Sequence, residues 1–412
     1  MQVQRSSRSR AAWHTRLVAV AAVAFGVATA GCTIGDVTPV GAVSEATAAD
    51  GTAATTTAAP ATPVLDVSAA DGATGVSPTA PLTVTAAGGT LTSVAVTNPA
   101  GERLAGTTAP DGLTWTSSEP LGYRTTYAVD ARATGAAGAV TTERSSFTTV
   151  APANLTMPYL NPTDGETVGI GQTVAVKFDE PIGDKVAAEQ AITVTTDPPV
   201  TGAFYWLNDT EVRWRPESYW TPGTTVSVTA DVYGRDLGSG LYGEADQSSS
   251  FTIGDAVTAV ADNATKTLTI SRNGQVEKTM PISMGVETPG KVTPNGVYIV
   301  AERYRDIVMD SSTYGLPVAS ADGYRTDVEY ATRMSYSGIF VHSAPWSLSD
   351  QGVRNVSHGC LNVSPANAVW FYENTTKGDL VTVNGTSGPT LSGVDGLGDW
   401  NVPWGEWVAG NR

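Results

Sequence analysis

Cysteine and histidine are scarce in this sequence, which has two cysteines and three histidines in 412 residues. A zinc site built from clustered Cys and His ligands is excluded, because Cys32 and Cys360 lie too far apart for the spacing of such sites. No disulfide can form within one domain. We therefore predict no metal and no cofactor. Apart from His14 and Cys32 near the N-terminus, the cysteines and histidines are Cys360, His342 and His358, which lie within one short stretch.

Basic residues are also few, with 24 Lys and Arg against 40 Asp and Glu and a formal net charge of −16. No basic cluster follows the N-terminal leader, which argues against nucleic acid as a partner. Leucine is sparse whereas threonine, alanine, valine and glycine are abundant, and this composition favours strands over helices. With 41% hydrophobic residues at this length, we expect two to four domains, each with its own core.

Residues 1–31 have the features of a signal peptide. Arginines precede an apolar run over residues 17–30 that is too short to span a membrane. The run ends in Ala-Gly before Cys32, which resembles a lipobox, although Thr29 stands where leucine is usual. Cleavage after Ala30 is the alternative. We expect export and acylation of Cys32, which would anchor the chain to the outer face of the plasma membrane through a flexible tether, residues 32–62.

Two similar segments follow, residues 63–150 and 151–254. Each has short alternating runs separated by Gly-, Pro- and Asp-containing turns, which predict an all-β sandwich. Matching positions recur at a spacing of roughly 100 residues, as expected for Ig-like sandwiches: Asp71 as Asp164, and Trp115 as Trp214. We interpret both tryptophans as core anchors and both domains as spacers.

The pattern changes in residues 255–385, which we assign to a third domain. Alternating runs over residues 257–282 predict a β-meander, with a hairpin turn at the Asn-Gly of 273–274. Ser364 and Pro365 have the features of an N-cap and a first helical residue, so we predict a helix that continues through Thr376 and ends before Gly378.

Two segments of this region are less regular. Residues 303–338 are rich in glycine and tyrosine, and we interpret them as a long loop that forms a lid. The C-terminal extension, residues 386–412, contains Trp400, Trp404 and Trp407. This is too apolar for a disordered end, so we expect it to pack on the third domain or on the second sandwich.

A candidate nucleophile lies in residues 357–362, which read Ser-His-Gly-Cys-Leu-Asn. A thiol at its ordinary pKa is mostly protonated at neutral pH, so an adjacent histidine must take the proton of Cys360. Gly359 lets the backbone approach a substrate closely, and N–H groups of residues 358–360 are candidates for an oxyanion hole. An unpaired thiol in an exported protein needs a reason, and catalysis supplies one.

Together, His342-Ser343 and the hexapeptide at 357–362 resemble the signature of the L,D-transpeptidases, the cysteine enzymes of the YkuD family. The surroundings, including Tyr324 and Trp346, resemble the actinobacterial branch with two N-terminal Ig-like domains. The resemblance implies a mostly β chain: two Ig-like β-sandwiches, a YkuD-type mixed β-sandwich with a few short helices, and a C-terminal extension.

This resemblance also implies a reaction. Cys360 would attack the carbonyl of the third residue of a peptidoglycan tetrapeptide stem, and the terminal D-Ala would leave. His342 would be the base, with its tautomer fixed by the carbonyl of Ser343, and His358 would be a structural residue or a second candidate. The thioester would then pass to the side-chain amine of a second stem, which gives a 3→3 cross-link in the cell wall. Carbapenems would acylate Cys360.

Five positions are expected to contact substrate. The resemblance places Met309, Tyr314 and Tyr324 along the substrate path under a β-hairpin flap. Trp346 either contacts substrate or closes the loop between His342 and Cys360. Asn362 is expected to orient the catalytic turn through its side-chain amide.

Three other functions are compared with the transpeptidase interpretation. An L,D-carboxypeptidase would discharge the same acyl-enzyme onto water. A non-catalytic envelope scaffold would need a degenerate site, and the residues around Cys360 are intact. A papain-like peptidase is disfavoured because that pattern places Cys before His, whereas His342 precedes Cys360.

Overall fold

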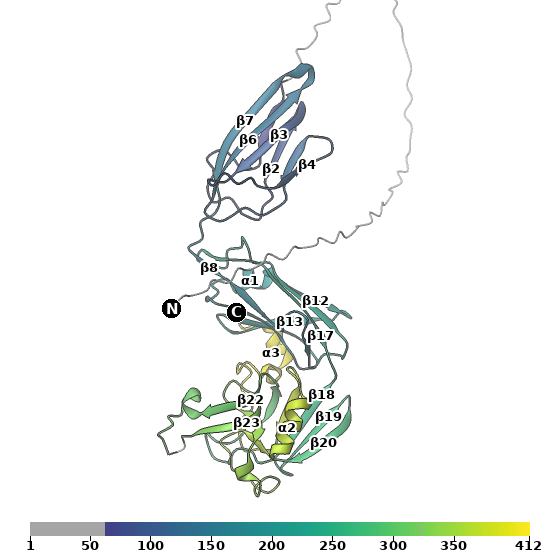
Figure 1. The fold of residues 1–412 in the computed structure, drawn as a ribbon, viewed down its shortest axis with the longest axis vertical. Coiled ribbons are helices and arrows are strands. Elements are labelled where there is room, and N and C mark those ends of the chain that lie inside the picture. Colours follow the sequence, from purple (N-terminus) through teal and green to yellow (C-terminus); the bar gives the residue numbers. More distant parts are fainter. Residues whose placement is uncertain (1–61, 322) are drawn as a thin grey trace, which may run out of the picture. The chain divides into compact units, whose positions relative to one another are not determined.

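The computed structural model describes residues 62–321 and 323–412. Strands dominate this part of the chain, with a few short helices, so the predicted mostly β fold class is confirmed (Figure 1). The leader, the tether and Cys32 lie outside the described residues. Within the described ranges, no helix is both long and apolar enough to cross a membrane.

The first sandwich packs a four-stranded sheet on a three-stranded sheet. The first sheet has the order β1 (Val64–Val67), β2 (Thr83–Ala87), β5 (Thr114–Ser117), β4 (Gly106–Thr108). The second has the order β3 (Gly89–Thr97), β6 (Thr126–Gly135), β7 (Val140–Thr148), with the 3-10 helix η1 (Ala136–Gly138) before β7. Alternation along β6 buries every second residue, and Trp115 and Phe147 belong to the resulting core.

The second sandwich has two four-stranded sheets and a short parallel pair. One sheet has the order β10 (Thr167–Val168), β17 (Gln247–Ile253), β15 (Thr225–Ala230), β12 (Ile192–Asp197). The other has the order β13 (Gly202–Asn208), β14 (Glu211–Pro216), β11 (Val174–Phe178), β9 (Pro158–Asn161). The remaining elements are the pair β8 (Asn154–Thr156) with β16 (Leu241–Gly243) and the helix α1 (Lys185–Ala191).

The repeat seen in the sequence corresponds to a repeated contact. Ser146 N–H donates to the Asp71 carboxylate over 2.8 Å, and Ser250 N–H donates to the Asp164 carboxylate over 2.9 Å. In each sandwich the aspartate therefore fixes the turn after it to the last strand. Because the same two positions pair in both sandwiches, the sequence repeat reflects equivalent positions in the two folds.

The two tryptophans of the repeat are core residues, as expected. Trp115 is 6% exposed and Trp214 is 7% exposed. A side chain at Gly106 would overlap the ring of Trp115, and one at Gly202 would overlap the ring of Trp214. Each ring therefore needs a glycine on the neighbouring strand, because no space remains for a Cβ atom.

The third domain packs two sheets around its own core. The larger sheet has the order β20 (Gln275–Pro281), β19 (Thr267–Arg272), β18 (Val257–Asp262), β26 (Leu380–Asn384), β21 (Gly296–Ile299). The predicted meander forms its first three strands, and Asn273 and Gly274 take positive φ in the hairpin turn. The smaller sheet has the order β22 (Arg303–Asp310), β23 (Arg325–Arg333), β24 (Phe340–Ser343), β25 (Leu361–Val363).

Two expectations for this domain need correction. Residues 303–338 are not mainly an irregular loop, because β22 and β23 pair as an antiparallel hairpin whose connection includes the 3-10 helix η2 (Ser311–Tyr314). The helix α2 (Pro365–Asn374) begins at the predicted N-cap, where Ser364 accepts from Asn367 N–H. It ends before Thr376, because Thr375 turns to extended backbone and its hydroxyl donates to the Phe371 carbonyl.

The C-terminal extension packs on both expected places, the second sandwich and the third domain. It contains the 3-10 helix η4 (Asp399–Asn401) and the helix α3 (Trp404–Ala409). Trp407 is fully buried, stacks on Tyr205 with ring centroids 4.9 Å apart, and donates from its indole to the Ala203 carbonyl. The Arg215 guanidinium lies 4.5 Å from the ring centroid of Trp400 and 4.3 Å from that of Trp407. Cation–π contacts therefore add to apolar burial in holding the extension.

Candidate active site

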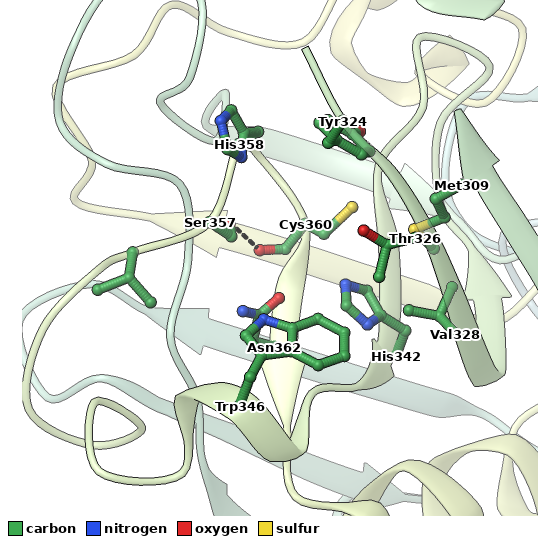
Figure 2. A pocket seen from close by; sticks show the side chains of 11 residues that line it. Met309, Tyr324, Thr326, Val328, His342, Trp346, Ser357, His358, Cys360 and Asn362 are labelled. Atoms are coloured by element: carbon green, nitrogen blue, oxygen red, sulfur yellow. Dashed lines mark hydrogen bonds between the residues drawn. The ribbon is translucent and has the colours of Figure 1, made fainter. Parts of the chain in front are cut away.

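The candidate nucleophile and the candidate base are positioned by adjacent parallel strands. β24 pairs with β25 so that His342 lies opposite Asn362, and Cys360 immediately precedes β25. Figure 2 shows the side chains of Cys360 and His342 on the lining of one cavity of about 200 Å³. A thiol and an imidazole that are separated in sequence thus share a single small space.

The catalytic turn is held by hydroxyl groups. Ser357 Oγ donates to the Cys360 carbonyl over 2.6 Å (Figure 2). It also accepts from Gly359 N–H over 3.1 Å. Buried Thr293 donates to the Gly359 carbonyl over 2.8 Å. Gly359 has φ of +132°, a conformation that favours glycine, and a Cβ there would meet no atom closer than 3.8 Å. Backbone conformation therefore gives one reason for this glycine, and the expected close approach to a substrate stays a prediction.

His342 is held as a neutral base. Its Nδ1 lies 2.9 Å from the Ser343 carbonyl, which can only accept, so Nδ1 carries the proton and Nε2 keeps a lone pair. His342 is only 4% exposed. Burial lowers the pKa of His342 to about 4, and the hydrogen bond to Ser343 opposes this only in part. At neutral pH the imidazole is therefore uncharged.

Cys360 is a neutral thiol for the same reason. The residue is 8% exposed, and its S–H donates to the Gly338 carbonyl with a sulfur–oxygen distance of 3.5 Å. Burial raises the pKa of Cys360 to about 11, while the Phe340 N–H and the charge of Arg333 act in the opposite direction. The resting site therefore holds a thiol and an imidazole rather than a thiolate–imidazolium pair.

The pH dependence of alkylation should report this protonation state. In a chain carrying Cys32→Ser, Cys360 is the one thiol. Because iodoacetamide reacts with the thiolate, we expect its rate to rise about tenfold per pH unit from pH 6 to 9, without a plateau. Mass spectrometry of labelled protein would measure it, with Cys32→Ser/Cys360→Ala as the unlabelled control. A plateau at or below pH 7 would show an ion pair instead.

The cavity brings together most of the residues expected at the site. Cys360, His342 and His358 line it together with the expected substrate-binding residues Met309, Tyr324, Trp346 and Asn362. Ser343 acts through its carbonyl, and Gly359 belongs to the turn beside the cavity. The side chain of Tyr314 lies outside what the structure describes.

Burial distinguishes the two histidines of the site. His342 is buried, whereas His358 is exposed, with its ring centroid 5.2 Å from that of Tyr324. These two rings also line a second cavity of about 350 Å³, to which Lys291 and Gly338 contribute. His358 and Tyr324 therefore form a wall shared by the two cavities, and His342 is the histidine whose environment suits a base.

Asn362 has a different role from the expected one. Its amide donates to Ser347 Oγ over 3.2 Å and does not orient the catalytic turn, which Ser357 holds. Ser347 ends the 3-10 helix η3 (Pro345–Ser347), so this bond fixes η3 beside β25. Trp346 lies on that helix, is 57% exposed, and has its ring centroid 6.0 Å from that of His342.

Several contributing residues were not anticipated. Thr326 and Val328 line the cavity beside Tyr324, because these three positions alternate along one face of the hairpin. That alternation was the signal available in the sequence. Ser357 and Thr293 hold the turn through hydroxyl groups, and nothing in the sequence pairs Thr293 with Gly359. Within residues 62–321 and 323–412, no group of three or more potential metal ligands is found.

Comparison with known families agrees with this geometry. The model of the L,D-transpeptidase catalytic domain (YkuD) matches residues 256–383. A model of a bacterial Ig domain matches residues 73–236. The first match contains every element that surrounds Cys360, and the second covers parts of both sandwiches.

Individual relatives extend the similarity beyond the third domain. L,D-transpeptidase 2 of Mycobacterium tuberculosis is 57% identical over 350 residues, which cover 85% of this chain and 85% of that protein. L,D-transpeptidase 5 of the same species is 39% identical over 85% of this chain and 77% of that protein. A solved L,D-transpeptidase in complex with imipenem is 41% identical, covers 55% of this chain and 97% of that one, and has a TM-score of 0.48. The chain belongs to the L,D-transpeptidase family.

Proposed function

We propose that this chain is a peptidoglycan L,D-transpeptidase that forms 3→3 cross-links through a thioester on Cys360. The observation that carries the proposal is the pairing in one cavity of a neutral thiol with an imidazole whose tautomer is set by the Ser343 carbonyl. This arrangement suits acyl transfer, in which the base must accept a proton and later return it.

In the first step the Cys360 sulfur attacks the carbonyl carbon of the third residue of a tetrapeptide stem. His342 Nε2 takes the thiol proton as the carbon–sulfur bond forms. The carbonyl oxygen becomes an oxyanion, for which the N–H of Cys360 is the candidate donor, since that of Gly359 already donates to Ser357. When the C–N bond to D-Ala breaks, the imidazolium returns the proton to the departing amine.

In the second step the side-chain amine of another stem attacks the thioester carbon. His342 accepts a proton from this amine, the carbon–sulfur bond breaks, and the sulfur recovers a proton from the imidazolium. The product is an amide between two stems, and the enzyme returns to its starting protonation state. One base therefore serves both steps.

The pKa values favour a proton transfer that is concerted with attack. An ion pair would require the thiol, with pKa of about 11, to protonate an imidazole with pKa of about 4. Such a pair is disfavoured in the empty site, so the thiolate develops only as it bonds to carbon. A buried thiol kept neutral in this way is also a poor target for oxidation outside the cell.

Space for a second stem supports transpeptidation over hydrolysis. The second cavity adjoins the first at Tyr324 and His358, so an acceptor stem bound there would lie next to the cavity that Cys360 lines. An L,D-carboxypeptidase would need only water as acceptor and would not require the second cavity. The scaffold alternative leaves the buried His342–Ser343 contact without a purpose.

The test is product analysis with a disaccharide-tetrapeptide. We expect a cross-linked dimer that has lost one D-Ala, detected by mass spectrometry. Tripeptide without dimer would indicate the carboxypeptidase, and intact substrate would favour the scaffold. A second incubation uses a tetrapeptide whose side-chain amine is blocked, so that it can act as donor but not as acceptor. The enzyme should still release D-Ala slowly from this substrate if the acyl-enzyme forms.

Two further parts of the proposal follow from the same chemistry. Carbapenems should acylate Cys360, since opening of the lactam ring requires the same nucleophile and base; the imipenem complex described above belongs to a relative. We also propose export and lipid anchoring through Cys32, which lies outside the described residues. The mass of the N-terminal peptide from the native host would report that acylation.

A further inference from the structure

The loop between β23 and β24 forms the wall behind the catalytic sulfur. Gly338, with φ of +98°, turns its carbonyl toward Cys360 and accepts from the thiol. The next strand begins at Phe340, whose N–H also acts on the sulfur. The orientation of the thiol therefore depends on the backbone of residues 338–340, which directly follows a tight turn over residues 335–338.

A carboxylate of the C-terminal extension holds that turn. Asp395 Oδ2 accepts from Ser335 Oγ over 2.8 Å and from Ser337 N–H over 3.1 Å, and Oδ1 accepts from Tyr336 N–H over 3.0 Å. Three successive residues of the turn thus donate to one side chain. A side chain on the neighbouring Gly396 would come within 2.7 Å of the Tyr336 ring, so the extension packs closely on the turn.

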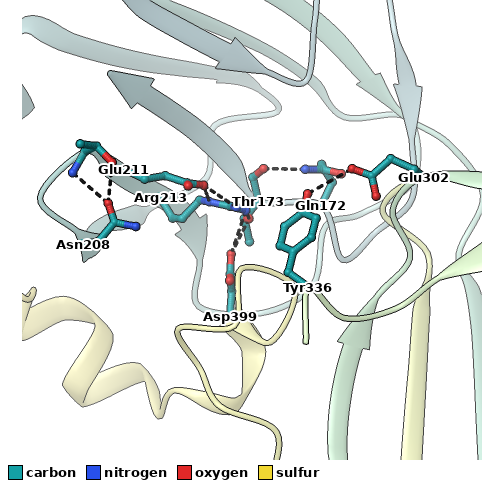
Figure 3. Close-up of polar contacts among 9 residues, drawn as sticks. Gln172, Thr173, Asn208, Glu211, Arg213, Glu302, Tyr336 and Asp399 are labelled. Carbon is teal, nitrogen blue, oxygen red and sulfur yellow. Dashed lines mark hydrogen bonds and ion pairs between the residues drawn. The ribbon is translucent and has the colours of Figure 1, made fainter. Parts of the chain in front are cut away.

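The extension is itself fixed from two directions. Leu397 accepts from Ile299 N–H over 2.9 Å, which ties the segment to β21 of the third domain. Asp399 pairs with Arg213 of the second sandwich at 3.4 Å and accepts from Thr173 Oγ1 over 2.6 Å (Figure 3). Asp395 therefore acts from a rigid support rather than from a loose terminus.

We propose that Asp395 is a positioning residue for the reaction: by fixing the turn over residues 335–337, it sets the Gly338 carbonyl against the Cys360 sulfur. The proposal rests on the proposed function of Cys360 as the nucleophile. Asp395 does not touch substrate or sulfur, and its effect passes through the turn.

This positioning has a chemical consequence. The Gly338 carbonyl accepts the thiol proton and would repel negative charge on sulfur, so it keeps the thiol neutral and aimed within the cavity. If the turn loosens, the sulfur loses this carbonyl and gains water. The thiol then ionises more easily but is no longer aligned for attack. Reactivity toward a small alkylating agent should therefore rise while transpeptidation falls.

The test compares these two rates in Asp395→Asn, made in the chain with Cys32→Ser. An amide has one acceptor oxygen, so it cannot serve both positions that the carboxylate serves. We expect kcat for dimer formation to fall by about tenfold to a hundredfold, as for a misplacement of about an ångström, with a smaller change in KM. We expect the iodoacetamide rate of Cys360 at pH 7.5 to rise about threefold or more, with the pH profile displaced to lower pH.

Matched variants separate positioning from stability. Glu406→Gln makes the same chemical change on an exposed residue of the extension and should leave both rates at the wild-type value. Ser335→Ala removes one donor to Asp395 and should shift both rates in the same directions by smaller factors. If Asp395→Asn does not fold, Ser335→Ala provides the test in its place. In the double variant Ser335→Ala/Asp395→Asn, the fold-change in each rate should be smaller than the product of the two single fold-changes, because both substitutions remove the same contact.

Each outcome bears on the proposal. Opposite changes in the two rates, in a variant folded at the assay temperature, support it. Unchanged rates in Asp395→Asn would overturn the proposal, and so would a loss of both rates together. If Asp395→Asn does not fold, the same two results in Ser335→Ala would overturn it. If the unsubstituted chain forms no dimer, the proposed function fails instead, and the alkylation rates still decide whether Asp395 controls the thiol.

Discussion

Replacement of Cys360 by alanine is expected to abolish cross-linking, with dimer formation reduced by at least about 10⁴-fold. Cys360 is the only cysteine in residues 62–321 and 323–412. The hydroxyl groups that line the cavity with it, on Tyr324, Thr326 and Ser357, are weaker nucleophiles than a thiol at neutral pH. The fold should tolerate the change. The sulfur packs in a small apolar cluster with Met309 and Phe340, so its loss costs about 1 kcal/mol, similar to the deletion of one buried methylene group.

Two measurements on Cys360→Ala check this prediction. Product analysis gives the loss of activity, and a thermal melt gives the change in stability, which should be a few degrees at most. A loss of several kcal/mol would indicate that Cys360 is mainly a core residue. Retention of dimer formation would remove Cys360 from the mechanism. Ser357→Ala is a useful comparison, because it loosens the turn while it keeps the thiol.

Replacement of His342 by glutamine should lower kcat/KM by about 10²- to 10⁴-fold, the contribution of a positioned general base. Glutamine has a similar size but cannot take the thiol proton. The rate that remains should increase with pH across the neutral range, because it now depends on spontaneous ionisation of Cys360. The pH–rate profiles of the two proteins measure this difference. A variant with nearly full activity would assign the base to another group.

The same substitution should change stability in acid. The pKa of His342 is about 4 in the folded protein against an ordinary value of 6.5, so the unfolded chain binds a proton that the folded chain does not. Stability from this group is complete above pH 6.5 and is lost as the pH falls from 6.5 to 4, by about 3 kcal/mol. His342→Gln lacks this loss.

Denaturant unfolding of both proteins between pH 7 and 4 tests this effect. The difference between their unfolding free energies, rather than either curve alone, isolates His342. Asp379, for example, has its pKa raised to about 7 by burial and stabilises the protein as the pH falls, but it contributes to both curves. Parallel curves would mean that His342 is not held neutral by burial.

Much of this protein follows from its sequence, and the features that do are local. The Asn-Gly turn at 273–274 and the N-cap at Ser364 act within a few residues, so their types alone specify the geometry. Trp115 and Trp214 repeat in alternating patterns, which identify core positions without knowledge of their neighbours. The motif around Cys360 and His342 likewise pointed to a candidate nucleophile and base through residue types and spacing that resemble the family signature.

The features that the sequence left open depend on contacts between distant segments. The residue pattern over 303–338 did not predict that β22 and β23 pair directly, since a long connection separates the two strands and charged residues occupy their exposed positions. The amide of Asn362 binds Ser347 rather than its own turn, because η3 folds back beside β25. Sequence patterns give the face of a strand but not the strand that will lie next to it.

The sequence by itself determined the chemistry that is available: the thiol of Cys360, a nearby imidazole and a glycine turn on a β scaffold. Only the tertiary structure decided the state of that chemistry. Parallel pairing of β24 with β25 buries His342 and Cys360 together, which makes both neutral, and the C-terminal extension brings Asp395 to the turn before Gly338. Burial and alignment are properties of the assembled fold, because they depend on which distant segments exclude water from the site.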